Sequence, residues 1–504
     1  MLCAEEGLQM TKCIKPHDKI NIVVYILLSF LMICMIEMTI KYPTNNLISW
    51  QMLLGTLIGT ILLLIVGKKW NRIYDKIGRK SAIYWMCLGM FGIALYAVSM
   101  SREDNRYTMI DYQQIYSAAA DLAVGKEITN ENYFLTYSNN LKPMLLLSVL
   151  FRIADFMHLP AFHFVLGINV LQILLVIWGC GYLAERNGDS RWRFPILMAY
   201  VFFLPIWGMA SVFYTDSMSF GLGILGLAML KKAHNTDGKA RWCWLGGASA
   251  YLVLAIAWKI TAIIPVIAAV IIVLWQKVQS DRKNIIEFLI IFGALSMMLS
   301  IWTNKYDIAR QAKTTANPLI SWVALGIKGN GSWDNNREFI LNLNELATTH
   351  EKKEYALNYI KENKNSFFDL EHLIQKNSQN FANGNMGVRE FLFIEKDDGT
   401  FLWNLFSPWG KYYWRMSQYC FCYLSSIYML LMLGMFQCVI EIFRGREVSP
   451  LLMVCQLSFF GIYIFLMLWE ANNRQMYNQM PGLILGAVLS LREILLNKPI
   501  KNSD

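Results

Sequence analysis

The strongest constraint on this chain is a series of long apolar runs that contain few charged residues. Examples are Ile20–Ile40, Ala82–Met100, Ile285–Thr303 and Leu451–Trp469. Each is long enough to cross about 30 Å of hydrocarbon as an α-helix. Because lipid offers no partner for backbone N–H and C=O groups, such runs are expected to be helices. With 55% hydrophobic and only 16% charged residues, the sequence predicts an all-α, multi-pass protein of the lipid bilayer.

About 12 segments qualify as transmembrane helices by length and apolar character, with a range of about 11–13. They are 20–41, 52–67, 82–100, 161–184, 195–213, 216–230, 243–258, 260–275, 285–303, 418–442, 450–469 and 479–496. The first segment has no small-residue cleavage site, so we expect it to be retained as a helix.

The basic residues of the chain gather in short loops between these segments. One loop holds six of them, Lys68, Lys69, Arg72, Lys76, Arg79 and Lys80, and two others hold Lys231, Lys232, Lys239 and Arg241, and Arg444 and Arg446. This is the positive-inside pattern of membrane proteins, which predicts that these loops and both termini are cytoplasmic. The net charge of +10 is thereby explained without nucleic acid as a partner.

One apolar helix, 143–158, is left over after the spans are assigned. Arg186, Arg191 and Arg193 should lie on the same side as the basic loop at 68–80. If 143–158 crossed the membrane, the two basic segments would face opposite sides. We therefore expect 143–158 to lie in the outer interface, as a helix of the first large outer loop.

The order of spans and long loops divides the chain into five parts. These are N-terminal transmembrane helices (1–100), a first extracytoplasmic loop with juxtamembrane helices (101–160), a transmembrane core (161–303), an extracytoplasmic helical region (304–417) and C-terminal transmembrane helices (418–504). Within 304–417, apolar residues at three- and four-residue spacing predict helices over Arg337–Thr348, Glu351–Lys364 and Phe367–Gln379.

Two acids stand at the predicted outer surface, Asp111 and Asp216. Asp111 with Gln114 three residues later has the arrangement of a capping box, followed by a short helix that Gly125 would end. Asp216 stands between two spans and fits the N-cap of the second. A pair of acids at one membrane surface is also the equipment of general-base catalysis. Both interpretations stay open for each residue.

Three cations are expected at the same level as these acids, namely Lys142, Lys259 and Arg474. Each could extend its charge to the lipid headgroups, as long basic side chains at helix ends do. Cations on the outer side run against the positive-inside pattern, however, and Lys259 has almost no loop around it. Together with Glu470 and the two acids, they suggest a site for a phosphate-bearing ligand.

The region from about 105 to 495 resembles the GT-C superfamily of membrane glycosyltransferases, in particular bacterial relatives of protein mannosyltransferases and of the aminoarabinose lipid A transferase. The resemblance lies in the order of several motifs: Asp111, an Ala-rich helix ending in Gly125, the aromatic segment Tyr133–Tyr137, Asn-Leu-Lys-Pro at 140–143, Phe151-Arg152, Tyr214-Thr215-Asp216, Lys259-Ile-Thr-Ala, and Trp469-Glu470 with Arg474 and Pro481. Departures from the family pattern include two extra spans before the usual first one and Gln475 where many relatives have tyrosine.

The resemblance implies inverting sugar transfer from a polyprenyl-phosphate donor to a hydroxyl of a cell-envelope acceptor at the extracytoplasmic face of the cell membrane. Asp111 would be the general base and Asp216 the second acid, which binds the acceptor or a metal. The donor phosphate would be held by Lys142, Lys259 and Arg474, and the sugar and acceptor contacted by Tyr112, Tyr133, Tyr137 and Glu470. No cofactor follows with certainty from the resemblance, and a divalent cation held by the carboxylates is possible. With six histidines and no outward cluster of them, a zinc site is not expected.

The rival class is a secondary transporter. The segment DKIGRK at 75–80 resembles the loop between the second and third spans of major-facilitator carriers, and about 12 spans would suit that fold. Against this class, the long loop here follows the ninth predicted span and faces outward. A scaffolding role is the third alternative, but it leaves the charged and aromatic outer loops unexplained.

Overall fold

The fold was examined in a computed structural model, which describes residues 16–44, 47–99, 110–128, 130–185, 189–275, 279–388, 401–407 and 409–496. Every element named within these ranges is an α-helix or a short 3-10 helix. The prediction of an all-α protein is confirmed. Of the basic residues used to assign the sides of the membrane, Arg186 lies outside the described residues.

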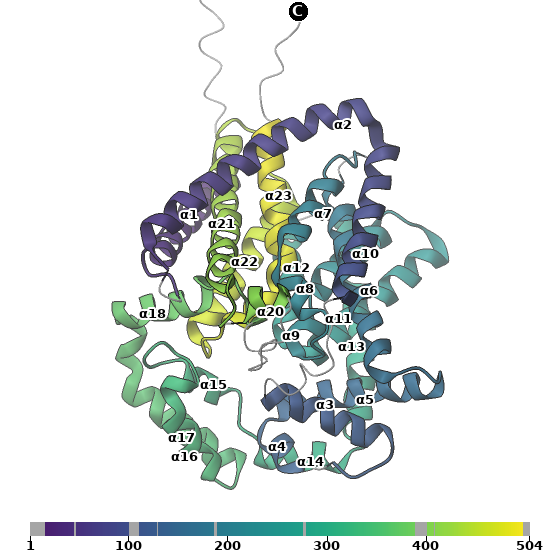
Figure 1. Cartoon of the computed structure of the whole chain (residues 1–504), viewed down its shortest axis with the longest axis vertical. Coiled ribbons are helices and arrows are strands. Elements are labelled where there is room, and N and C mark those ends of the chain that lie inside the picture. Colours follow the sequence, from purple (N-terminus) through teal and green to yellow (C-terminus); the bar gives the residue numbers. More distant parts are fainter. Residues whose placement is uncertain are drawn as a thin grey trace, which may run out of the picture.

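Long helices run side by side along the main axis of the molecule (Figure 1). Among the described residues, seven helices are long and apolar enough to cross a membrane: Ile20–Lys41, Ser49–Gly78, Ala161–Ala184, Gly238–Trp258, Ile285–Thr303, Tyr413–Phe443 and Pro450–Leu468. They belong to α1 (Pro16–Lys41), α2 (Ser49–Ser99), α6 (Ala161–Ala184), α11 (Gly238–Trp258), α13 (Gln279–Thr303), α21 (Tyr413–Phe443) and α22 (Pro450–Leu468). Of the remaining predicted spans, 82–100 lies in the second arm of α2 as far as residue 99, and the others are shorter or broken helices.

Close packing at the centre of the bundle depends on small residues. Helix α23 (Met480–Leu496) packs along α21. At Gly434 of α21, a Cβ atom would lie 2.0 Å from the Ser490 hydroxyl of α23. Small residues at such crossings let helix backbones approach closely, which favours helix association in lipid. Around this centre, apolar side chains of α1, α2 and α13 stay exposed, as expected for surfaces that face lipid.

The predicted basic loop at 68–80 is not a loop. The label α2 covers residues 49–99, which form two helical arms that meet at a kink at Gly78, where φ is 73° and ψ is 173°. Only glycine adopts such a backbone conformation readily. The basic residues before it therefore extend the first arm of α2, and the helix then turns back along the bundle (Figure 1).

Two other predicted spans are each broken into two helices. Residues 195–213 form α7 (Arg193–Phe202) and α8 (Pro205–Met209), and residues 216–230 form α9 (Thr215–Met218) and α10 (Leu222–His234). Pro205 begins α8, and Gly221 with φ 63° separates α9 from α10. Further breaks occur at the 3-10 helices η3 (Ile260–Ile263), which leads into α12 (Ile264–Trp275), and η6 (Asn473–Gln479), which leads into α23.

One end of the bundle collects basic side chains, and we call it the basic end. The Trp70 indole of α2 donates to the carbonyl of Arg191, and the Arg191 guanidinium lies 3.8 Å from the Asp75 carboxylate. These contacts confirm the prediction that the arginines near 191 share one side with residues 68–80. Nearby, Lys231 and Arg492 donate to the last carbonyl groups of α6, including those of Leu183 and Ala184.

The opposite end of the bundle carries the helices of the two long loops, and we call it the site end. It holds α3 (Ile110–Ala123), α4 (Glu131–Thr136) and α5 (Leu141–Phe156). Helix α6 starts at this end, where Phe162 contacts Phe213 with ring centroids 5.3 Å apart, and reaches the basic end at Ala184. Because the chain is at the site end both before and after α5, this helix does not connect the two ends. That agrees with the charge argument for residues 143–158.

A group of helices that we call the cap covers the rest of the site end (Figure 1). It consists of α14 (Asp307–Thr315), α15 (Ile320–Leu325), α16 (Arg337–Glu345), α17 (Thr349–Asn363) and α18 (Leu370–Phe381). The last three confirm the helices predicted from spacing, with ends shifted by a few residues. The cap rests on α4, where the backbone N–H of Asn317 donates to the carbonyl of Thr136, and on α1, where Asn377 donates to Thr39.

Candidate functional site

Four charged side chains from four distant segments meet at the site end. They are Asp111 of α3, Asp216 of α9, Lys259 between α11 and η3, and Arg474 of η6. Lys259 forms an ion pair with Asp216, and Arg474 lies 3.7 Å from Asp111 and 3.9 Å from Asp216. Arg474 thus stands between the two carboxylates. The structure brings together four of the residues that the sequence singled out.

Asp216 is buried because the chain breaks its helix at this point. The predicted N-cap role is wrong, since Tyr214 occupies that position and Asp216 is the second residue of the four-residue helix α9. The backbone N–H of Tyr214 donates to the Ser217 hydroxyl at 3.4 Å. Ser217, and not Asp216, therefore caps this short helix. Its side chain is 0% exposed. A buried carboxylate needs a cation, and Lys259 provides one.

Lys259 points into the bundle and not toward the headgroups. Its backbone is extended at the end of α11, with φ −157°, so the side chain leaves the helix direction and reaches Asp216. A polar network holds this bend: the Asn478 amide donates to the hydroxyls of Thr261 and Ser219, at 3.0 and 3.3 Å. Gln479 also donates to the Thr261 carbonyl at 2.8 Å. The site therefore rests on three helix breaks that are fixed to one another.

Arg474 is held from several sides. Its guanidinium lies over the Tyr214 ring, 5.2 Å from the centroid, and its backbone N–H donates to the Asn472 side chain at 3.2 Å. The turn at residues 383–387 packs against it, since a Cβ atom on Gly387 would lie 2.6 Å from the Cβ atom of Arg474. Cation–π contact and close packing both restrict the guanidinium to the space between the acids.

Asp111 is the more accessible of the two acids. Its side chain is 33% exposed, against 0% for Asp216. The hydroxyl of Tyr133 donates to one carboxylate oxygen at 2.8 Å, and that of Tyr214 to the other at 3.3 Å. Asp111 is the second residue of α3, so it lies inside the first turn and not at the N-cap position. Gly125, with φ 75°, follows the end of α3 as predicted.

Tyr133 is kept in its neutral form by its surroundings. Burial, and then the nearby charge of Asp111, raise the pKa of Tyr133 well above its ordinary value. The phenol therefore remains a hydrogen-bond donor to Asp111 at any physiological pH. Asn140 donates to the same phenol oxygen at 2.6 Å, which orients the hydroxyl toward the carboxylate.

Two other residues predicted for the site, Glu470 and Tyr137, lie around the charged cluster and are not members of it. Glu470 lies near enough for its charge to act on Lys259 and Tyr137. Tyr137 contacts the Tyr133 ring at 5.2 Å, while its hydroxyl accepts from Asn344 of the cap at 3.2 Å.

Two predicted residues are not brought to the charged cluster. Tyr112 is fully buried and points away from it, donating to the Ser211 carbonyl at 3.4 Å. Lys142 is exposed at the second position of α5, and no contact joins it to the cluster within the described ranges.

Sequence reasoning did not assign roles to several residues that complete the site. Tyr214 and Asn140 stood inside quoted motifs without a function of their own, and the turn at Gly387 gave no signal. A phenol beside a carboxylate looks like any interfacial aromatic until the fold brings the two segments together. Among the described residues, no group of three or more His, Cys, Asp or Glu side chains is arranged to hold a metal ion.

A small open cavity adjoins the accessible acid. It has a volume of about 390 Å³ and is lined by Gln114, Ile128, Asn130, Glu131, Asn132 and Tyr133. Amide, carboxylate and phenol groups of this kind suit a ligand with several hydroxyl groups. Since Tyr133 also bonds Asp111, the cavity gives a route from solvent toward that carboxylate.

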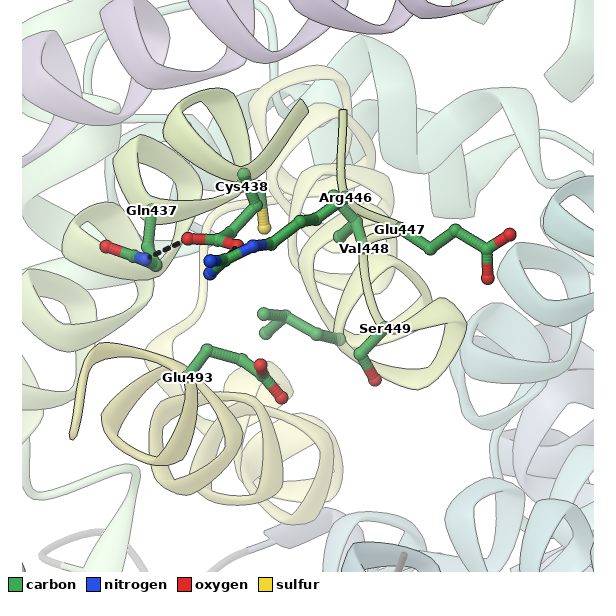
Figure 2. Close-up of a pocket in the computed structure, with 9 residues that line it drawn as sticks. Gln437, Cys438, Arg446, Glu447, Val448, Ser449 and Glu493 are labelled. Carbon is green, nitrogen blue, oxygen red and sulfur yellow. Dashed lines mark hydrogen bonds and ion pairs between the residues drawn. The ribbon is translucent and has the colours of Figure 1, made fainter. Parts of the chain in front are cut away.

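A second cavity of about 390 Å³ lies at the basic end (Figure 2). Its lining includes Glu441 and Arg446 of the α21 end and Glu493 of α23. Glu441 accepts from Gln437 at 2.8 Å and from Arg446 at 3.2 Å, and Glu493 accepts from Arg492 at 2.8 Å. Each of these contacts joins residues at most five positions apart, at the end of one helix.

Comparison with known proteins assigns the chain to a family. No curated protein and no solved structure matches it. One family model matches residues 16–495, which is nearly the whole chain. Because this match covers nearly the whole chain, the chain belongs to the family described as conserved hypothetical integral membrane protein.

Proposed function

We propose that this protein is an inverting glycosyltransferase that moves a sugar from a polyprenyl-phosphate donor to a hydroxyl of an envelope acceptor. In this proposal, the chain crosses the cell membrane about 12 times with cytoplasmic termini, in keeping with the positive-inside pattern. The site end then faces the extracytoplasmic side. The resemblance to the GT-C superfamily names the reaction, and the geometry of the charged cluster supports it.

The observation that carries the proposal is the unequal environment of the two acids. Asp111 is partly open to solvent and is held by two phenols, whereas Asp216 is closed off and neutralised by Lys259. An accessible carboxylate can accept a proton from a substrate hydroxyl. A fixed arginine beside it can stabilise negative charge that develops on a phosphate. The cluster therefore offers a base and an anion-binding group side by side.

The proposed reaction uses these groups in one displacement. The acceptor oxygen attacks the anomeric carbon and its proton passes to Asp111. The bond from that carbon to the phosphate oxygen breaks, and the electron pair leaves on the phosphate. Arg474, which lies 3.7 Å from Asp111 and 3.9 Å from Asp216, would contact the phosphate from this position, with Lys259 behind it. Glu470 and the cavity beside Tyr133 would orient the sugar and the acceptor. Asp111 and Asp216 are the carboxylates that would hold a divalent cation, whose charge would help to stabilise the leaving phosphate.

The rival transporter interpretation fits the place of the charged cluster less well. The DKIGRK segment contains the kink at Gly78, where the two helical arms of α2 meet, so this segment does not separate the two classes. The charged cluster lies at one end of the bundle, beside the cap. A secondary transporter would more typically place its site near the middle of the bilayer.

The test is sugar transfer by the purified full chain in detergent, with a panel of polyprenyl-phosphate sugars and envelope acceptors. Asp111→Asn should lower the rate by about 100-fold or more, as expected for loss of a general base. Exposed Asp155→Asn on α5 serves as the matched control and should leave the rate unchanged. Equal transfer by Asp111→Asn would remove this residue as the base. Movement of a solute across vesicles by the same preparation, without transfer, would overturn the proposal.

A further inference from the structure

The cavity beside Tyr133 borders one oxygen of the accessible acid. Tyr133 lines the cavity and donates to the Oδ1 atom of Asp111 at 2.8 Å. Gln114 also lines the cavity and stands three residues after Asp111 on α3. Residues at this spacing are neighbours on one face of a helix. A ligand in the cavity would therefore lie next to the Oδ1 side of the carboxylate.

The cations of the site gather at the other oxygen of the same carboxylate. Arg474 lies 3.7 Å from the Oδ2 atom of Asp111, to which the Tyr214 hydroxyl also donates at 3.3 Å. Behind Arg474, Lys259 pairs with Asp216. Basic side chains of this kind suit a phosphate group. The two oxygens of Asp111 thus separate a cationic side, fit for a phosphate, from the cavity.

The cavity itself carries negative charge. Glu131 of α4 lines it, and within the described part of the chain its lining includes no basic residue. A phosphate or carboxylate placed here would meet the like charge of Glu131, with that of Asp111 behind Tyr133, and such an encounter is unfavourable. Hydroxyl and amino groups, in contrast, can donate to the oxygens of the lining. The cavity therefore favours a ligand without acidic groups.

Gln114 adds a hydrogen-bonding group to the wall of the cavity. Because α3 begins at Ile110, Gln114 lies beyond the first turn and not at the capping position that its spacing predicted. Among the described residues, its amide oxygen is buried and has no hydrogen-bond partner. Such an oxygen lowers the stability of the free protein. The terminal torsion of a glutamine amide is soft and roughly two-fold, so a turn of the amide can present this oxygen to a donor in the cavity.

We infer that this cavity is the acceptor subsite and takes a sugar unit without acidic groups, which Gln114 recognises by a hydrogen bond and Glu131 selects by charge. Its volume of about 390 Å³ falls in the range of small-ligand sites, roughly 300–1,000 Å³. The role as acceptor rests on the proposed function, whereas the binding of such a sugar does not. A donor phosphate at Arg474 and a sugar hydroxyl in the cavity would then meet at Asp111.

The experiment measures the binding of two matched probes, a trisaccharide of glucose and a trisaccharide of glucuronic acid, to the purified full chain in detergent at low salt. Wild type should bind the neutral probe at least about tenfold more tightly, because Glu131 repels the acidic one. Glu131→Lys should remove this preference. Glu127→Lys is the matched control, since Glu127 is an exposed acid four residues earlier and outside the cavity lining. It should keep the preference of wild type.

A second variant tests the hydrogen bond. Gln114→Met keeps the approximate size of the side chain and removes its buried polar group. It should weaken binding of the glucose trisaccharide by about tenfold without lowering the unfolding temperature, whereas loss of a merely structural glutamine would lower it. Gln113→Met is the control, at the neighbouring position of α3 and outside the cavity lining, and should bind as wild type does.

The outcomes separate this subsite from the glycosyltransferase proposal. The expected binding pattern, with no sugar transfer from any donor, would support the subsite and count against the enzyme. Transfer to acidic acceptors as fast as to neutral ones would support the enzyme and overturn the subsite. Equal binding of the two probes by wild type, binding of neither, or equal effects of Glu131→Lys and Glu127→Lys would also overturn it.

Discussion

The two ends of the bundle treat their charges differently. At the basic end, Arg444 and Arg446 stay about half exposed, 52% and 54%, while both pair with Glu441, whose side chain is 8% exposed. They extend from the end of a continuous helix, α21. At the site end, Asp216 is fully buried and Lys259 and Arg474 are only 14% and 13% exposed, and all of them stand on helix breaks or short 3-10 turns.

The difference shows that a functional site is marked by two features together: charged side chains that are shielded from water, and breaks in the helices that carry them. An arginine that is half exposed at a helix end stays solvated with or without its partner, so its ion pair adds little to stability. A buried ion pair exists only where the fold forces it, because desolvation offsets much of the attraction. Side chains on helix breaks can also converge from several directions, which side chains on one face of a continuous helix cannot do. Four predictions test this comparison.

The largest effect is expected for Asp216→Asn. The variant keeps the shape of the side chain but leaves the buried Lys259 without a charge partner. Loss of one partner of a buried pair destabilises proteins by about 3–5 kcal/mol. The measurement is thermal unfolding of the purified protein in detergent. Asp216→Asn combined with Lys259→Met should recover most of that loss, and an unchanged unfolding temperature in the single variant would contradict the buried pair.

A smaller effect is expected for Gly387→Ala. The residue has φ 78°, and its new Cβ would lie 2.6 Å from the Cβ of Arg474. Strain of this kind costs about 1–3 kcal/mol, and displacement of the arginine should lower transfer more than stability. Gly445→Ala is the control, because Gly445 has φ 67° with nothing within 4 Å. Equal effects of the two variants on transfer would show that backbone strain alone, and not contact with Arg474, is responsible.

The third prediction concerns the pH dependence of stability. Burial in the cap lowers the pKa of Lys376 of α18 to about 7 in the folded protein, against an ordinary value of 10.5. Between these values the unfolded chain binds the proton and the folded chain does not. The free energy of unfolding of wild type, relative to Lys376→Met, should therefore rise by about 1.4 kcal/mol per pH unit from about 7 to 10. The check is denaturant unfolding of both proteins across that range, and parallel curves would show that the lysine does not titrate there.

The smallest effect is expected for Glu441→Gln at the basic end. The amide keeps the shape of the carboxylate and can still accept from Gln437, Arg444 or Arg446. Since both arginines reach solvent, we expect a loss of less than about 1 kcal/mol and no change in transfer. Thermal unfolding and transfer assays on this variant measure the contrast with Asp216→Asn directly. A loss as large as that of Asp216→Asn would erase the difference between the two ends.

Several features of this protein followed from local sequence. Apolar length predicted the long helices, three- and four-residue spacing predicted α16, α17 and α18, and charge placement predicted that Arg191 shares one end with residues 68–80. These features depend on solvation and periodicity, which neighbouring residues determine. The sequence also selected Asp111, Asp216, Lys259 and Arg474 as residues of one site, because acids and outward cations beside apolar helices are costly and therefore rare.

Other features were decided only by the tertiary structure. Residues 68–80 were expected to form a loop but continue α2 as far as Gly78, because flanking helix turns outweigh local charge. Tyr112 and Tyr133 are both tyrosines of the same loop, yet one packs in the core and the other donates to Asp111. Lys376 is buried against the carbonyl of Gly326, which stands 50 positions earlier in the chain. Which buried groups face each other is a property of packing between distant segments, and no local pattern records it.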